Sequence, residues 1–201
     1  YTFTDLEAST TLKELVVGNA VLNVAGFIQL SGNFAIRSSS DAVTVDGVET
    51  AVDVLTIGAS NVSAFAGYNG GTDNAVGLQL TNTNFALGLF AETGGDRNWT
   101  TLQGDVESVA FVGIPGLTVE VTTFAVEVNL EASDETVIDY SVENYEVDLG
   151  GGNSLSFSMD AALGELIQVT GTLTLEVATL FRVTGDFAFV SSFGEVTLSD
   201  A

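Results

Sequence analysis

The side chains best suited to chemistry in this chain are carboxylates and amides in polar, often glycine-rich turns. They are Asp73, Asn74, Asp96, Asp134 and Asp148. Calcium takes about six to eight oxygen ligands, which carboxylates, amide oxygens and backbone carbonyls can supply. No turn carries the complete D-x-[DN]-x-[DN]-G pattern of a calcium-binding loop. The turns therefore predict Ca²⁺ as the cofactor, with ordinary solvated turns and no cofactor as the alternative.

Charge and residue types exclude several classes of protein. The chain has 27 acidic and 4 basic residues, a net charge of −23, and neither cysteine nor histidine. Nucleic-acid binding requires clustered Lys and Arg, so no nucleic-acid partner is expected. Ser-His-Asp and Cys-His catalysis is excluded, and no carboxylate pair stands out as a general acid and base, Asp105 and Glu107 included. The prediction is that the chain is not an enzyme.

One aromatic residue raises a second possibility. Trp99 follows a glycine-rich turn, and its place there predicts partial exposure. An exposed aromatic ring is a typical contact in surfaces that bind carbohydrate, because it offers a rigid apolar plate with a polar edge. The alternative function is thus a carbohydrate- or surface-binding module. The phenylalanines mostly fall on alternating or corner positions, which favours core packing.

The elements that would position these groups are β-strands almost throughout. Within residues 169–177, Val169, Leu173, Leu175 and Val177 share one face of a predicted strand, and Thr or Glu residues share the other. No stretch approaches the roughly 18 apolar residues that a membrane-spanning helix needs, so no transmembrane segment is predicted. The sequence therefore predicts an all-β fold.

The strand alternation slips by one residue at several places, such as Thr122–Thr123 and Thr83–Asn84. Such a slip reverses the buried face unless the strand bulges or turns a corner there. With the polar turns, these slips define units of strand, corner, strand and turn, each roughly 20 residues long. We expect a β-solenoid-like stack of these units, with an antiparallel β-sandwich or a meander of long bent strands as the alternative.

The end of the chain repeats its beginning. The run FIQLSGNFAI at residues 27–36 returns as LFRVTGDFAF at residues 180–189, about 153 positions later. Matches at the same shift continue on both sides of this run. We therefore describe residues 1–201 as one continuous all-β repeat region with a period of about 153 residues, in which residues 1–47 are equivalent to residues 154–201.

The phrases along the chain also resemble a known class of proteins. Residues 54–65 read VLTIGASNVSAF, and residues 76–80, 109–113 and 137–140 follow before a glycine-rich turn that leads into Leu155. This order resembles the tandem repeats of giant bacterial extracellular or cell-surface proteins, loosely called adhesin-like, over nearly the whole chain. The resemblance implies an extended, often calcium-stiffened structure for attachment or matrix building. The nonapeptide calcium repeat known from some such proteins is absent here.

These observations predict a structural repeat module of a large secreted or cell-surface protein. It would form part of a stalk, a fibre or an adhesin body, with an acidic surface that responds to calcium. The expected partners are neighbouring copies of the same repeat and cell-surface or matrix glycans. The expected location is extracellular or at the cell surface.

Overall fold

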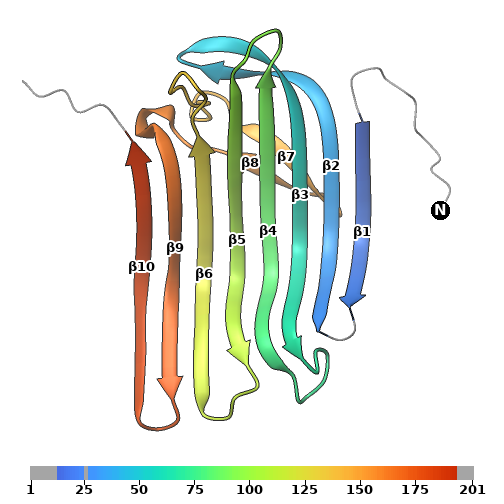
Figure 1. Cartoon of the computed structure of the whole chain (residues 1–201), viewed down its shortest axis with the longest axis vertical. Coiled ribbons are helices and arrows are strands. Elements are labelled where there is room, and N and C mark those ends of the chain that lie inside the picture. Colours follow the sequence, from blue (N-terminus) through green and yellow to red (C-terminus); the bar gives the residue numbers. More distant parts are fainter. Residues whose placement is uncertain (1–12, 25–26, 194–201) are drawn as a thin grey trace, which may run out of the picture.

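The computed structural model describes residues 13–24 and 27–193, and these residues form an all-β fold (Figure 1). The strands are β1 Lys13–Val24, β2 Ile28–Val45, β3 Val48–Tyr68, β4 Val76–Glu92, β5 Asn98–Val112, β6 Leu117–Leu130, β7 Tyr145–Gly150, β8 Asn153–Phe157, β9 Glu165–Val177 and β10 Phe181–Phe193. Among the described residues, one 3₁₀ turn, η1, covers Ala161–Leu163. None of the described helical residues forms a segment long and apolar enough to cross a membrane.

Eight of the strands form one antiparallel sheet in the order β1-β2-β3-β4-β5-β6-β9-β10. The order follows the chain except between β6 and β9, where the β7–β8 hairpin lies behind one half of the sheet (Figure 1). Among the described strands the sheet does not close, so β1 and β10 are its edges. The meander of long strands is therefore the arrangement that fits, and the solenoid expected from the sequence is not confirmed.

The slips in alternation are β-bulges in the middle of long strands. The pairing register shifts between Ala59 and Val62 in β3 and between Thr122 and Ala125 in β6. Asn61 and Thr123 have φ values of 52° and 51° at these places. An extra residue at a bulge restores the side-chain phase, so apolar residues stay on one face along the whole strand. A bulge thus replaces the corner that a solenoid would need.

Pairing assigns each strand residue to one of two faces, because directly paired residues point to the same side of a sheet. We call the side that carries the β7–β8 hairpin the hairpin face, and the opposite side the open face. Val54, Phe90 and Trp99 follow one another across β3, β4 and β5 on the hairpin face. Leu55 and Leu89 pair on the open face.

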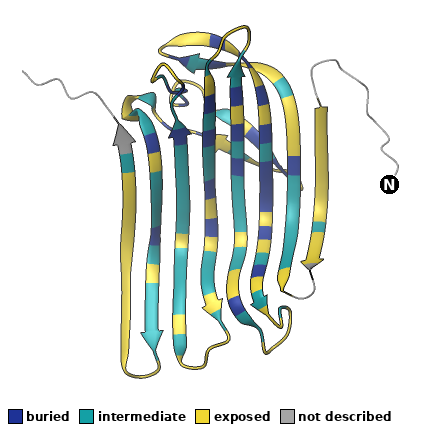
Figure 2. Cartoon of the chain, in the orientation of Figure 1, coloured by how far each residue is buried: buried dark blue, intermediate teal, exposed yellow. Residues whose placement is uncertain are grey.

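The buried core lies between the hairpin face and the β7–β8 hairpin. Its largest fully buried side chains include Trp99, Tyr140, Phe90 and Phe157. The rings of Tyr140 and Phe157 lie 5.3 Å apart, centroid to centroid. Figure 2 shows buried residues gathered on the middle strands, whereas β1 and β10 are largely exposed. The hairpin thus gives one half of the sheet a second layer.

The hairpin approaches β3 closely at a glycine. A Cβ atom at Gly58 would overlap the carbonyl oxygen of Asp148, so only glycine allows this contact between backbones. Beside it, the hydroxyl of Ser60 donates to the carbonyl of Gly150 at 3.0 Å, and the Asn153 amide donates to that hydroxyl at 3.2 Å. These contacts fix the hairpin on the sheet.

Candidate functional site

The structure separates most of the predicted calcium ligands. Asp73 and Asn74 lie in the turn between β3 and β4, whereas Asp96 lies in the turn at the other end of β4. Asp134 lies in the connection that follows β6, and Asp148 lies in β7. Within the described residues, no three acidic side chains converge closely enough to hold a metal ion. Calcium binding by these residues remains a prediction.

Two of the predicted ligands already have partners within the chain. The Asp134 carboxylate accepts hydrogen bonds from the hydroxyl and the backbone N–H of Thr136, at 2.7 and 3.3 Å. These bonds, together with the nearby charge of Arg97, lower the pKa of Asp134. The Asp148 carboxylate accepts from the backbone N–H of Gly150 at 2.7 Å. Both carboxylates therefore stabilise the local turn.

Hydrogen bonds and an ion pair made by Arg97 stabilise the turn that contains Asp96. Its guanidinium donates two hydrogen bonds to Glu92, at 2.9 and 2.6 Å, and lies 3.5 Å from Asp134. These bonds lower the pKa of Glu92 and raise the pKa of Arg97. Arg97 also lies 5.1 Å from the centre of the Trp99 ring, within the range of a cation–π contact.

The predicted exposure of Trp99 is wrong. Its side chain is only 1% exposed, and its indole N–H donates to the carbonyl of Thr136 at 3.0 Å. The loop after β6, distant in sequence, covers the ring, and local sequence does not reveal such a cover. An exposed aromatic pair does exist at the other end of the sheet, where the rings of Phe27 and Tyr68 lie 6.4 Å apart. The basis for a glycan site at Trp99 is therefore lost.

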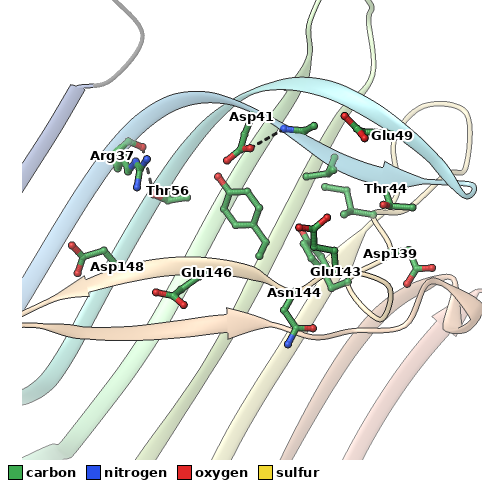
Figure 3. A pocket seen from close by; sticks show the side chains of 15 residues that line it. Arg37, Asp41, Thr44, Glu49, Thr56, Asp139, Glu143, Asn144, Glu146 and Asp148 are labelled. Carbon is green, nitrogen blue, oxygen red and sulfur yellow. Dashed lines mark hydrogen bonds between the residues drawn. The ribbon is translucent and has the colours of Figure 1, made fainter. Parts of the chain in front are cut away.

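An acidic cleft of about 490 Å³ lies between the hairpin and the ends of β2 and β3 (Figure 3). Six carboxylates line it: Asp41, Glu49, Asp139, Glu143, Glu146 and Asp148. Arg37 is the one basic residue in its lining. Tyr145 also lines the cleft, and burial followed by the charge of Asp41 raises the pKa of its hydroxyl. This electrostatic environment disfavours anionic ligands.

Asp139 at this cleft gives the fold a dependence on pH. Its carboxylate accepts from the Ser141 hydroxyl at 2.7 Å and from the Ser141 and Ala161 N–H groups at 3.0 and 3.5 Å. These bonds, the Ser141 hydroxyl first, lower the pKa of Asp139. A carboxyl group whose pKa is lower in the folded state stabilises the fold above its unfolded pKa. That contribution is lost as the pH falls through the folded pKa.

We therefore expect Asp139→Asn to flatten the acid side of the stability profile. Urea unfolding from neutral pH to about pH 2 should show a smaller loss of stability in the variant than in the parent chain. Asp46→Asn, in the exposed β2–β3 turn, is the matched control. Parallel profiles for the Asp139 variant and the parent would contradict the assignment.

The two edges of the sheet are formed by the segments that repeat in the sequence. The β1–β2 hairpin forms one edge and the β9–β10 hairpin forms the other. Near their turns the two hairpins pair identically, because Leu22 pairs with Leu30 as Leu175 pairs with Val183. Further from the turn, the registers differ by one residue, because β1 has a bulge between Val17 and Ala20.

Each edge strand lacks the neighbour that its repeat counterpart has. β2 pairs with β3, whereas its counterpart β10 pairs only with β9 among the described strands. A Cβ atom at Gly32 of β2 would meet Val62 of β3, but one at the equivalent Gly185 of β10 would meet nothing within 4 Å. Ala35 is 2% exposed, whereas its counterpart Ala188 is exposed. β10 thus resembles a sheet interior strand with one side uncovered.

Gly58, Ser60 and Asp139, which hold the second layer, are not among the site residues predicted from the sequence. A glycine within an otherwise β-branched strand is a signal for close backbone approach, and Gly58 follows Thr56 and Ile57. The approaching segment, however, is distant in sequence. No protein-family model matches the chain, and neither a curated protein nor a solved structure shows significant similarity to it.

Proposed function

We propose that the chain is a structural repeat module of a large secreted or cell-surface protein, in which tandem copies extend one antiparallel sheet. The observation that carries this proposal is the equivalence of the two edge hairpins. In a tandem array, β9 and β10 would serve as the first two strands of the next repeat. A strand equivalent to β3 would then pair with the free side of β10.

A sheet extended in this way would bear mechanical load as part of a stalk, a fibre or an adhesin body. Each repeat would add six strands, equivalent to β1–β6, to the sheet. At a strand spacing of about 4.8 Å, six strands lengthen the sheet by roughly 29 Å. The location outside the cell rests on the resemblance to giant surface proteins and on the composition of the chain.

The experiment extends the chain by one repeat. Residues 48–200 are appended after Asp200, so that a β3 equivalent follows β10 in the natural order. The small-angle scattering profile should match a sheet that is roughly 29 Å wider across its strands, with little change in its thickness or in its length along the strands, which is the longest axis of the single chain (Figure 1). Two separate bodies joined by a linker, or a thicker particle, would contradict a continuous sheet.

A glycine substitution is a second test of the same tandem arrangement. Gly185→Val should leave the stability of the 201-residue chain nearly unchanged, since its Cβ meets nothing within 4 Å. In the extended chain the same change should destabilise the junction, because the counterpart Gly32 lies against Val62. Equal effects in both chains would indicate that β10 does not acquire a β3-like neighbour.

The acidic surface is proposed to respond to calcium, and thermal unfolding tests this. A few millimolar CaCl₂ should raise the unfolding midpoint relative to excess EDTA at equal ionic strength. One site at a hundredfold excess over its dissociation constant contributes about 2.7 kcal/mol. Asp73→Asn and Asp96→Asn remove carboxylates in exposed turns. An unchanged midpoint in the parent chain would mean that the carboxylates are solvated surface groups that do not bind calcium.

A further inference from the structure

The open face is apolar across the full width of the sheet. Its central row is Ile36, Ile57, Leu87, Leu102, Val128 and Ile167, which pair in succession from β2 to β9. A second row, beyond the bulges, is Leu22, Leu30, Ala64, Leu80, Val109, Val121 and Leu173. No described segment covers this face (Figure 1). Apolar rows of this kind usually face a protein core.

Most charged side chains on the strands lie on the hairpin face. Glu120, Glu127 and Glu176 are each next to an open-face residue in the sequence, so their side chains point to the hairpin face. By the same register, Lys13, Asp53 and Glu165 do lie on the open face, near the end of the sheet that carries the β7–β8 hairpin. The chain has a net charge of −23, yet its apolar face between the turns is poor in charge.

The size of this face is sufficient for a stable interface. Eight strands at about 4.8 Å spacing, with about ten residues of each at 3.3 Å, give roughly 1,300 Å² per copy. A typical stable complex buries about 800 Å² on each partner. Exposed apolar surfaces larger than a few hundred Å² are rare in monomers and mark interaction sites.

We propose that the open face binds the open face of a second copy of this chain, forming a two-layered dimer. Two such faces would pack about 10 Å apart, as the sheets of a β-sandwich do. The acidic turns and hairpin faces would then point away from the interface. An anionic lipid surface is the less suitable occupant, because it would bring negative headgroups against the apolar face, whereas a second open face brings mainly apolar side chains. This proposal does not depend on the tandem arrangement.

The test uses matched lysine substitutions on the two faces. Leu78 and Leu173 lie on the open face and are 43% and 41% exposed, so lysine at both positions is compatible with folding. Gln79 and Thr174 follow them in sequence and point to the hairpin face. The double variants Leu78→Lys with Leu173→Lys and Gln79→Lys with Thr174→Lys change the net charge equally.

Sedimentation equilibrium should show a dimer for the 201-residue chain and for the hairpin-face variant. The open-face variant should dissociate, with a dissociation constant raised about a hundredfold or more, because unpaired ammonium groups would be buried. A monomeric parent chain, open-ended association into a ladder of oligomers, or equal dissociation of both variants would overturn the proposal. Binding of the parent to phosphatidylserine vesicles without self-association would also overturn it.

Thiol alkylation provides a measurement that does not depend on lysine tolerance. The chain has no cysteine, so Leu173→Cys and Thr174→Cys each introduce a single reporter. Raising the protein concentration should slow alkylation at position 173 at least tenfold and leave position 174 unchanged. Concentration-independent alkylation at position 173 would overturn the proposal.

Discussion

Phe157→Ala is expected to produce the largest loss of stability from a single side chain. Phe157 is completely buried and packs between the rings of Tyr140 and Tyr145, with centroid distances of 5.3 and 6.4 Å. Truncation of a buried phenylalanine removes its transfer free energy and leaves a cavity, at a cost of about 3–5 kcal/mol. The packing that is lost belongs to the layer formed by the β7–β8 hairpin.

Urea unfolding monitored by the single tryptophan, Trp99, measures this effect. Trp99 belongs to the same buried cluster as Phe157, so its emission should shift when the cluster opens. Phe181→Ala, on an edge strand where the ring is 48% exposed, is the matched control and should cost much less. Comparable losses for the two variants would show that the hairpin layer is not the main core.

Gly58→Val is expected to displace the β7–β8 hairpin from the sheet. The added side chain would overlap the carbonyl of Asp148 and the backbone of Leu149, neither of which is the end of a flexible group. Overpacking of this kind costs about 1–3 kcal/mol, and the backbone contact places Gly58→Val near the upper end of that range. The bond from the Ser60 hydroxyl to Gly150 should be lost with it.

Hydrogen exchange distinguishes hairpin displacement from global unfolding. Amides of β7 and β8 should lose protection in Gly58→Val, whereas those of β4 and β5 at the centre of the sheet should keep most of theirs. Gly185→Val in the same chain is the control, because its Cβ has no neighbour within 4 Å. Uniform loss of protection throughout the sheet would mean that the two layers unfold as one unit.

Alternation along the chain was sufficient to predict an all-β fold and the places where strands change phase. The slip at Thr122–Thr123 is a bulge with a positive φ at Thr123. Alternation does not encode which strand lies beside which, because a corner in a solenoid and a bulge in a long strand leave the same one-residue slip. The preference for a solenoid was therefore not confirmed.

Contacts between distant segments decided most of the candidate site. Trp99 is covered by the loop that carries Thr136, and Asp148 is held against Gly58, ninety positions earlier in the chain. The prediction that Asp73 and Asp96 lie in turns is confirmed, because aspartate and the neighbouring glycines favour turns. Turn chemistry says nothing about whether separate turns meet in space.

The order of the strands has a consequence for how such a protein carries tension. The described chain enters the sheet at β1 and leaves it at β10, on opposite edges. Interstrand hydrogen bonds run perpendicular to the strands, and therefore along the line between those edges. A pull applied through the two ends loads the strand pairs in series, so they separate one pair at a time instead of shearing together. Each separated pair lengthens the chain between its two ends. An array of such sheets would therefore extend stepwise under load and dissipate mechanical energy.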